Sequence, residues 1–480
     1  MIMILIDIKE DELKLQERIA EKCKNLLDEQ ERLEFESGLQ EVLSETFRNL
    51  FHLRLQEGYK LLEDFLRGWV NRFWAKILRL LFSFPDFLEV LKQIGAKRGY
   101  KYKGMREITL YTPGGGKCKI KSPYFLKAKS KRGKKKNGPN GRGCHLGLEV
   151  LGFVNKVAPP LAMKGIAFSL LCPSFEFASK LLEQEGIRLD GKKLSKLCED
   201  FGEEVFENRV RYSLKEGETL RGQRVVITVD GGRSRRRKNK RGRRKSGQKG
   251  CGYNSDWIEP KMFVIYVLDE EGNVEKEIEP NVDGAIGVYG FMELLQSYLI
   301  ELEIQEAEEV ILCGDGAEWI WERVPKLLLK LGVLPEKLFE VLDYTHGKQN
   351  LYETYNKLSK KQQRKVSLKQ WKEWLWEGKI EKIKEDIKRV CNKGGKKALA
   401  KVKSYFEKNK HRMFYKESSD RNRPCGSGVV ESAIRRVINL RLKSCGTFWK
   451  ERKIEIMLYL RAQLLYGRWD YLYSNWLKVS

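Results

Sequence analysis

The sequence lacks any Cys-x-x-Cys pair, and its ten cysteines and four histidines form no cluster with zinc-finger spacing. Structural zinc sites are built from such closely spaced ligands, so the sequence predicts no structural zinc centre. The cysteines are scattered along the chain, and reduced thiols in a cytosolic protein are the simplest interpretation.

Long uninterrupted hydrophobic runs are also missing. Charged residues and a proline interrupt the most apolar segment, 69–94, at Arg72, Lys76, Arg79, Pro85 and Asp86. Such a segment does not suit a membrane span. The first residues, MIMILIDIKEDE, are apolar, but no basic stretch precedes them and Asp7 interrupts them, which is not typical of a signal peptide. We therefore expect no membrane association.

Acidic residues are scarce relative to basic ones: 93 Lys and Arg against 66 Asp and Glu give a formal net charge of +27. A protein this basic usually works on a polyanion, because its summed charge attracts phosphate backbones. The charge favours nucleic acid over ribosome or membrane-surface contact. With 480 residues, 41% of them hydrophobic, the chain is globular, and this length suits roughly two to four domains.

The first part of the chain reads as three modules. Residues 1–95 have apolar residues at helical spacing and predict a helical packing or self-association module. Residues 96–158 predict two short strands around the turn sequence PGGG, and then a basic loop, 127–143, that we expect to contact phosphate. Residues 159–217 predict short helices in a helix–break–helix pattern. That pattern suits a helix-turn-helix DNA-binding module and a small structural bundle equally well.

From residue 218 the pattern becomes α/β. Five strands are predicted, at 224–229, 262–268, 274–278, 309–313 and 339–342. Three consecutive strands followed by alternating helices and strands is the order of a ribonuclease-H-like fold. Residues 359–418 are rich in Lys and Trp and predict an all-helical insertion. The insertion divides the expected catalytic domain into 218–358 and 419–480, and the second part contains a long predicted helix at 429–443.

Three carboxylates stand where they could meet. Asp230 closes the first predicted strand, Asp315 closes the fourth, and Glu431 lies in the first turns of the late helix. Each alone is an ordinary residue for a turn or a helix start. In a ribonuclease-H-like sheet, however, the first and fourth strands are neighbours, and a later helix against the sheet can add the glutamate. Clustered carboxylates repel each other unless a cation lies between them. Carboxylate ligands suit Mg²⁺ or Mn²⁺, and two such ions serve phosphodiester displacement.

Four segments, VDGG, GDGAEWIW, LDYTH and GSGVVESAIRRVINLRLKSCGTFW, resemble the DDE transposases of bacterial insertion sequences, of the Mutator-like and Kra type. The resemblance runs in segment order from about residue 100 to about residue 470. It implies a metal-binding triad of Asp230, Asp315 and Glu431. It also implies an Asp-x-x-His element at Asp343 and His346, and a helical insertion between the second aspartate and the glutamate.

His346 follows the fifth predicted strand, whose end points to the same face as the carboxylates. A lone histidine is usually a packed or hydrogen-bonded residue; here we also count it as a candidate catalytic residue that orients the scissile phosphate or a water. Arg435 lies four residues after Glu431, where it could pair with that glutamate, clamp a DNA phosphate, or do both.

The segment 233–249 carries eleven basic residues and no acid, directly after Asp230, and we expect it to be a loop on DNA phosphates. The expected DNA-binding residues are Arg233, Arg235, Arg236, Arg237, Lys238, Arg241, Arg243, Arg244, Arg435 and Arg436.

These features predict a DNA transposase that cuts phosphodiesters at transposon ends and joins the 3′ ends to target DNA, without ATP or an organic cofactor. Its expected partners are double-stranded DNA and further copies of itself, in the bacterial cytoplasm at the nucleoid. Two alternatives remain open. One is a structure-specific nuclease or resolvase of the same fold, which would not join strands. The other is a non-catalytic DNA-binding protein descended from a transposase.

Overall fold

The computed structural model describes residues 29–51, 55–127, 143–240, 247, 252–390, 396–444 and 446–479. The chain divides into two compact units: one is formed by 1–204 with 474–480, and the other by 205–473. Within the described ranges, no helix is both long and apolar enough to cross a membrane. Apart from its two end residues, the basic loop predicted at 127–143 lies outside the described residues.

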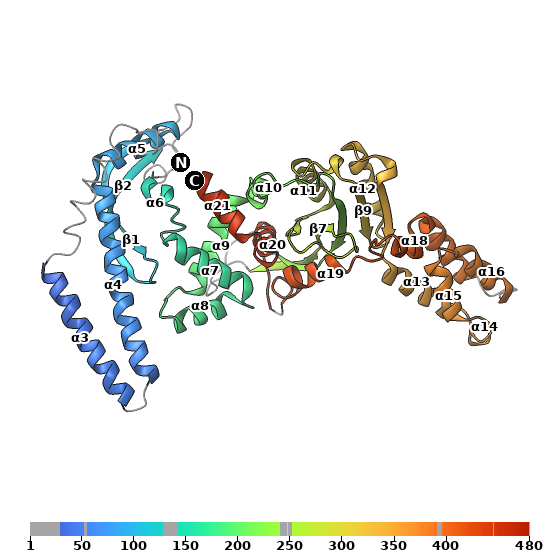
Figure 1. The fold of residues 1–480 in the computed structure, drawn as a ribbon, viewed down its shortest axis with the longest axis horizontal. Helices are drawn as coiled ribbons and strands as arrows, with labels where there is room; N and C mark the ends of the chain where they lie inside the picture. Colours follow the sequence, from blue (N-terminus) through green and yellow to red (C-terminus); the bar gives the residue numbers. More distant parts are fainter. Residues whose placement is uncertain are drawn as a thin grey trace. The chain divides into compact units, whose positions relative to one another are not determined.

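The first unit combines helices with a β-hairpin (Figure 1). Its elements are α3 (Glu29–Phe51), α4 (Leu55–Ser83), α5 (Pro85–Lys97), β1 (Tyr100–Tyr111), β2 (Lys117–Lys127), β3 (Gly143–Cys144), α6 (Leu146–Val150), α7 (Pro159–Leu171), α8 (Phe175–Gln184) and most of α9 (Gly191–Phe206). β1 and β2 pair antiparallel around the PGGG turn, which confirms the predicted hairpin. The helical prediction for the N-terminal region is confirmed in its described residues.

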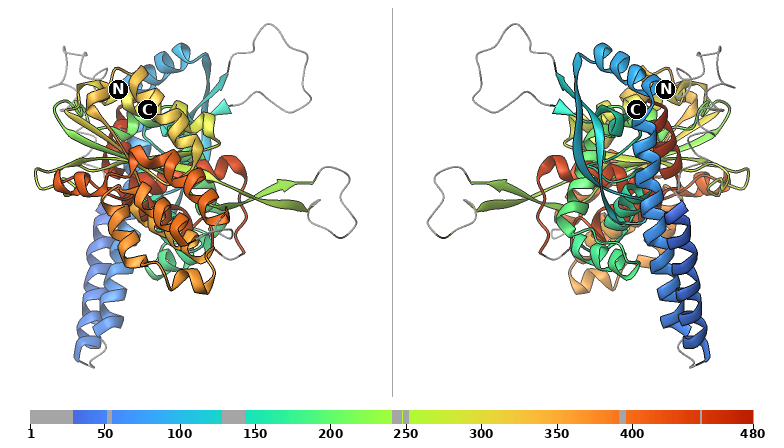
Figure 2. Two further views of the ribbon diagram at one scale, coloured as in Figure 1. Left: turned by 90° about the vertical axis from the view of Figure 1, so that its right-hand side faces the viewer. Right: turned by 90° about the vertical axis from the view of Figure 1, so that its left-hand side faces the viewer.

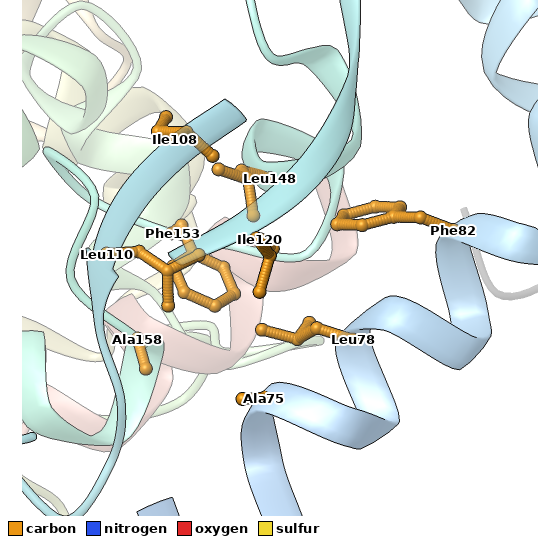
Figure 3. Close-up of a cluster of buried hydrophobic side chains, with 9 residues drawn as sticks. All are labelled: Ala75, Leu78, Phe82, Ile108, Leu110, Ile120, Leu148, Phe153 and Ala158. Carbon is orange, nitrogen blue, oxygen red and sulfur yellow. The ribbon is translucent and has the colours of Figure 1, made fainter. Parts of the chain in front are cut away.

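The core of this unit forms where α4 lies against the hairpin. Figure 3 shows Ala75, Leu78 and Phe82 of α4 facing the side chains of the two strands. Spacings of three and four residues put these three on one face of the helix. The side chains that complete the cluster come from the two strands, from α6 and from the chain after it: Ile108, Leu110, Ile120, Leu148, Phe153 and Ala158. A continuous apolar stripe on α4 therefore fixes the hairpin in place.

The predicted helix–break–helix pattern within 159–217 corresponds to α8 and α9. Ser174 is the N-cap of α8, and its side chain accepts a hydrogen bond from the Phe177 amide at 3.0 Å. The chain breaks after α8 at Gly186, which has a φ of +72°, and resumes as helix at Gly191. The helical elements are thus confirmed, while a helix-turn-helix function for them stays a prediction.

The second unit is built on a five-stranded mixed sheet with strand order β10-β9-β4-β7-β8. Its strands are β4 (Arg224–Gly231), β7 (Pro260–Leu268), β8 (Asn281–Ile286), β9 (Glu309–Gly314) and β10 (Leu338–Leu342). β4 runs parallel to β9, and β9 runs parallel to β10. β7 is antiparallel to both of its neighbours. The predicted adjacency of the first and fourth sheet strands, β4 and β9, is confirmed.

Helices cover both faces of this sheet (Figure 1). The helices that contact its strands include α11 (Val288–Glu301), α19 (Gly428–Ile434) and α20 (Glu451–Leu465), and α12 (Glu318–Lys330) packs against α11. The unit also contains α10 (Arg209–Ser213), α13 (Tyr344–Asn356) and the start of α21 (Trp469–Val479). Phe263 of β7 packs its ring against Phe291 of α11. The next residue back, Met262, points to the other face, where Leu458 of α20 lies near Gly284 of β8. Because both faces are covered, β7 is buried along its whole length, as the apolar run 262–268 predicts.

The helical insertion predicted at 359–418 is confirmed in its described residues. It contains α14 (Lys360–Gln363), α15 (Leu368–Trp376), α16 (Ile380–Val390), α17 (Lys396–Lys401), a π-helical turn (Val402–Glu407), a 3₁₀ turn (Lys410–Arg412) and α18 (Tyr415–Asp420). Trp371 is fully buried at its centre, and its indole N–H donates to Asp386 at 2.7 Å. The insertion therefore has a packed interior of its own.

Two predictions about elements are wrong. The third strand of the sheet is β8, not 274–278, where Val274 makes only an isolated bridge to Leu268. The late helix is shorter than 429–443: α19 is followed by a π-helical segment, Arg435–Asn439, and the helix ends there.

Candidate active site

Asp230 is the next-to-last residue of β4, so it belongs to the strand end itself. Its Oδ1 accepts a hydrogen bond from the Gly231 amide at 2.6 Å. A side chain at Gly231 would collide with Glu259, and one at Gly232 would collide with Ile438 in the segment after α19. Gly232 therefore lets that segment pack closely against the end of β4, and Gly231 leaves room for Glu259.

Asp315 follows the last residue of β9. In the parallel register, Val229 of β4 lies opposite Gly314 of β9. Asp230 and Asp315 each come one residue later, so both reach the same edge of the sheet. Asp315 Oδ1 accepts a hydrogen bond from the Ala317 amide at 2.9 Å, which holds the carboxylate at the strand end.

Glu431 and His346 approach this edge from two helix starts. Glu431 lies in the first turn of α19 and His346 in the first turn of α13. The His346 Nε2 atom lies 3.6 Å from Glu431 Oε1. The two side chains keep 36% and 48% of their surface exposed, so both remain accessible to a ligand.

Asp343 connects these two helix starts. It is buried, with 2% of its surface exposed, and its Oδ1 accepts the His346 amide at 2.9 Å as the N-cap of α13. Its Oδ2 accepts both the amide of Ser427, at 2.5 Å, and the hydroxyl of Ser427, at 2.9 Å. Ser427 is the residue before α19. One carboxylate thus fixes His346 and Glu431 relative to each other.

The four side chains of the predicted site act on one another electrostatically. The pKa of Asp230 is raised to about 6, chiefly by burial; the nearby charges of Asp315 and Glu431 add to this shift, while the Gly231 amide and His346 oppose it. The structure thus brings the three predicted acids and the predicted histidine to one place. Carboxylates in such a cluster are costly to ionise together without a cation.

The donor set fits a hard divalent cation. The Oδ2 atoms of Asp230 and Asp315 accept no hydrogen bond from the described residues, and Glu431 is half exposed. Free carboxylate oxygens are the ligands that Mg²⁺ and Mn²⁺ prefer. Asp230 and Asp315 do not share a closer spacing: among the described residues, the one group of three possible ligands whose ligand atoms all lie within 4.8 Å of one another is Asp343, His346 and Glu431. Both oxygens of Asp343 already face protein donors, however, so its observed role is to position the other two.

Ser427 is the residue of this site that the sequence reasoning did not single out. Its position in Gly-Ser-Gly just before α19 resembles an ordinary helix start. What makes it important is a partner 84 positions earlier in the chain, Asp343. Such a long-range pairing leaves no local pattern in the sequence.

The basic segment predicted as a loop at 233–249 is in part a strand, which corrects the prediction. β5 (Ser234–Asn239) pairs antiparallel with β6 (Tyr253–Ile258). Figure 2 shows these two yellow-green strands extending away from the rest of the unit. β6 supplies polar and aromatic side chains that pair with the basic strand and hold it in place. These partners lie outside 233–249, so the charges of that segment alone could not reveal them. Of the predicted DNA contacts here, Arg241, Arg243 and Arg244 lie outside the described residues.

The hairpin sorts its basic side chains into two classes. Arg236 pairs with Asp256 and Glu451, both at 2.5 Å, and Lys238 also pairs with Asp256, at 3.0 Å. The Arg235 guanidinium stacks on two aromatic rings, Trp257 at 4.9 Å and Phe448 at 5.6 Å. Of the predicted DNA contacts on this segment, Arg233 and Arg237 are exposed and have no acidic partner among the described residues.

The two arginines predicted on the late helix also differ from each other. Arg435 is exposed, and no ion pair among the described residues joins it to Glu431, whose charged neighbour is His346. Arg436 instead donates to the hydroxyl of Tyr466 at 2.7 Å. Arg435 is therefore the one of the two that is open to a phosphate.

Comparison of the sequence with protein-family models and with curated proteins found no match.

Proposed function

We propose that this protein is a metal-dependent DNA transposase of the DDE type, with a ribonuclease-H-like catalytic domain. The observation that carries the proposal is the placement of Asp230 and Asp315 at the carboxyl edge of two parallel strands, with Glu431 and His346 near enough to act on Asp230 electrostatically. The strand order supports the fold assignment, because the first sheet strand in sequence lies at the centre, between the second and the fourth. The net charge of +27 supports DNA as the substrate.

In this proposal, Asp230, Asp315 and Glu431 hold the divalent cations. Bound Mg²⁺ or Mn²⁺ activates the attacking oxygen and stabilises the leaving oxygen of a phosphodiester. His346, on the open side of Glu431, orients the scissile phosphate or the attacking water. Water first releases a 3′-hydroxyl at the transposon end. That hydroxyl then attacks a target phosphodiester, and the target's 3′-oxygen leaves. Two ends must be cut and joined together, so we propose that the protein acts as a dimer or larger assembly on DNA.

The exposed arginines of the β5–β6 hairpin would contact the DNA that enters this site. β5 begins four residues after Asp230, so the hairpin starts at the edge where the acids lie. Arg233 and Arg237 on the hairpin, and Arg435 after Glu431, are exposed cations. Guanidinium groups bind phosphate in a bidentate manner.

The decisive experiment follows cleavage and joining of a labelled duplex that carries the ends of the mobile element, with Mg²⁺ and then with EDTA. We expect the wild-type protein to cut at the ends and join them to target DNA with Mg²⁺, and to do neither with EDTA. Activity that survives EDTA would exclude the metal mechanism. Cutting of branched DNA without joining would support the structure-specific nuclease instead.

The two classes of hairpin cation should separate in a binding assay. We expect Arg233→Gln and Arg237→Gln each to weaken duplex binding for all sequences and to lower the slope of log affinity against log salt by about one unit per lost phosphate contact. Arg236→Gln is the matched control: it removes the same charge from the same strand, but this arginine is already paired with Asp256 and Glu451. The measurement is fluorescence anisotropy over a salt series. An equal slope change in all three variants would contradict the assignment.

A further inference from the structure

The first unit contains a basic pocket of about 340 Å³ far along the chain from the acids. Three separate segments form it: the middle of α4, the turn between β1 and β2, and the chain between α8 and α9. Its lining residues are Arg67, Asn71, Tyr111, Gly114, Gly115, Gly116, Lys117, Gly186 and Arg188. No acidic residue is among them.

The glycine turn in this pocket is held in a conformation that other residues would disturb. Gly115 has a φ of +84°, and a side chain there would lie 2.9 Å from Ile187. Gly114 and Gly116 both pack directly on Asn71, whose Oδ1 accepts bonds from the Thr112 hydroxyl and, at 3.4 Å, from the Gly116 amide. Asn71 of α4 therefore fixes the turn. Because the three glycines have no side chains, the backbone of the turn forms part of the pocket wall. The amides of Gly115 and Gly116 already donate to the Thr112 carbonyl and to Asn71 Oδ1, so the turn shapes the wall and the side chains around it must supply the donors for an anion.

Three cations surround this wall. Lys117 and Arg188 are exposed, and neither has an acidic partner among the described residues. The ammonium of Lys117 lies 5.4 Å from the centre of the Tyr111 ring, which confines it to the pocket side of β2. Arg67 pairs with Glu63 through one terminal nitrogen, while its Nε is buried without a hydrogen-bond partner. The pocket thus combines two open cations with an unsatisfied guanidinium N–H.

We propose that this pocket binds a phosphate group, and that the phosphate belongs to the backbone of double-stranded DNA. Arginine donors and a lysine charge around a glycine turn match the acceptor oxygens of phosphate. A free phosphate would satisfy the same groups. Exposed cations at the rim and the basic character of the whole chain favour a polymer. The phosphate chemistry stands on the pocket alone; its assignment to DNA rests on the proposed function.

The test compares the Lys117→Gln/Arg188→Gln double variant with a matched control, Lys103→Gln/Lys121→Gln. The control removes two exposed lysines from the same hairpin outside the pocket. Two probes are titrated in EDTA: inorganic phosphate, by calorimetry, and a DNA duplex, by anisotropy over a salt series. We expect the pocket variant to bind inorganic phosphate at least about tenfold more weakly than wild type, because two charged hydrogen-bond donors are lost. Its DNA salt slope should fall by about one unit, whereas the control should keep both values.

Each other outcome overturns a defined part of the proposal. Equal phosphate binding by the pocket variant and wild type overturns the pocket. Lost phosphate binding with an unchanged DNA slope overturns the DNA assignment and makes a free phosphate the ligand. Because both titrations are made in EDTA, the metal site does not enter them. A failure of the proposed function would appear separately, as wild-type protein that does not cut DNA with Mg²⁺.

Discussion

Asp315→Asn should lower the rates of DNA cleavage and joining by about three orders of magnitude or more, since the metal contributes several kcal/mol to the transition state. The substitution keeps size and shape, and the asparagine oxygen can still accept the hydrogen bond that the Ala317 amide now donates at 2.9 Å. It removes a negative charge that raises the pKa of Asp230, so repulsion at the strand ends falls and folding is not harmed. Binding to DNA should survive. The measurement is single-turnover cleavage with Mg²⁺ alongside duplex affinity.

Two further variants sharpen this result. Glu431→Gln should behave like Asp315→Asn, because it removes the third carboxylate from the same place. Glu318→Gln is the control. It lies three residues beyond Asp315, at the start of α12, but it is exposed and pairs with Lys408 on the surface. An exposed pair of this kind contributes little to stability because solvent screens it, so this variant should remain active. An Asp315→Asn protein that cuts at nearly the wild-type rate would remove the acids from the mechanism.

The parts of the sheet that the sequence predicted well are those whose burial is uniform. β4 and β7 read as unbroken apolar, β-branched runs because helices cover both of their faces. Asp230 and Asp315 stand out because each ends such a run just before glycine or at the strand end. Their neighbourhood then follows from the parallel pairing of β4 with β9. For these elements, pattern and topology together were enough.

The third strand was missed because its sequence contradicts its environment. Asn281–Ile286 contains an aspartate and a glycine, residues that are depleted in strands. Asp283 is fully buried there because the chain supplies partners: the Gly284 amide at 2.7 Å, the Tyr298 hydroxyl at 3.2 Å and Arg209 at 3.6 Å. Its pKa is raised, with burial as the main cause. Tyr298 and Arg209 lie in other elements of the chain, so local periodicity favoured the more regular but exposed segment 274–278 instead.

Long-range partners also explain what the sequence could not say about the site and its surroundings. The order in β5 comes from Asp256 and Trp257 on β6, and from Glu451 more than 200 residues later. Asp343 sets the distance between His346 and Glu431. The family resemblance points to Asp343, but its local sequence predicts only a helix cap. The local sequence therefore identified the acidic and basic residues of the site and its surroundings. Tertiary contacts decide which of these side chains are already paired within the protein and which are open to a ligand.

Asp343→Ala should be the most destabilising single change at the site that leaves the three proposed metal-binding acids intact. It removes the N-cap of α13, a loss of about 0.5–2 kcal/mol. It also leaves the buried amide and hydroxyl of Ser427 without their acceptor, at about 1–3 kcal/mol for each unsatisfied group. Both helix starts that carry His346 and Glu431 then lose a common anchor. We expect a lower unfolding midpoint and, by hydrogen exchange, faster exchange confined to the first turns of α13 and α19.

Two matched variants separate the contact of Asp343 with the start of α13 from its contact with Ser427 before α19. Asp343→Asn keeps an oxygen for the His346 amide but turns an amide N–H₂ toward the donors of Ser427, so α13 should stay protected while α19 does not. Ser427→Ala removes only the hydroxyl and keeps the backbone bond to Asp343, so its effect should be the smallest of the three. The variants whose α19 start exchanges faster should cleave DNA more slowly with Mg²⁺. Asp343→Ala and Asp343→Asn should therefore cleave more slowly than Ser427→Ala, because both Asp343 substitutions misplace Glu431. Full cleavage by an Asp343→Asn protein whose α19 start exchanges freely would show that the contact of Asp343 with Ser427 does not position the glutamate.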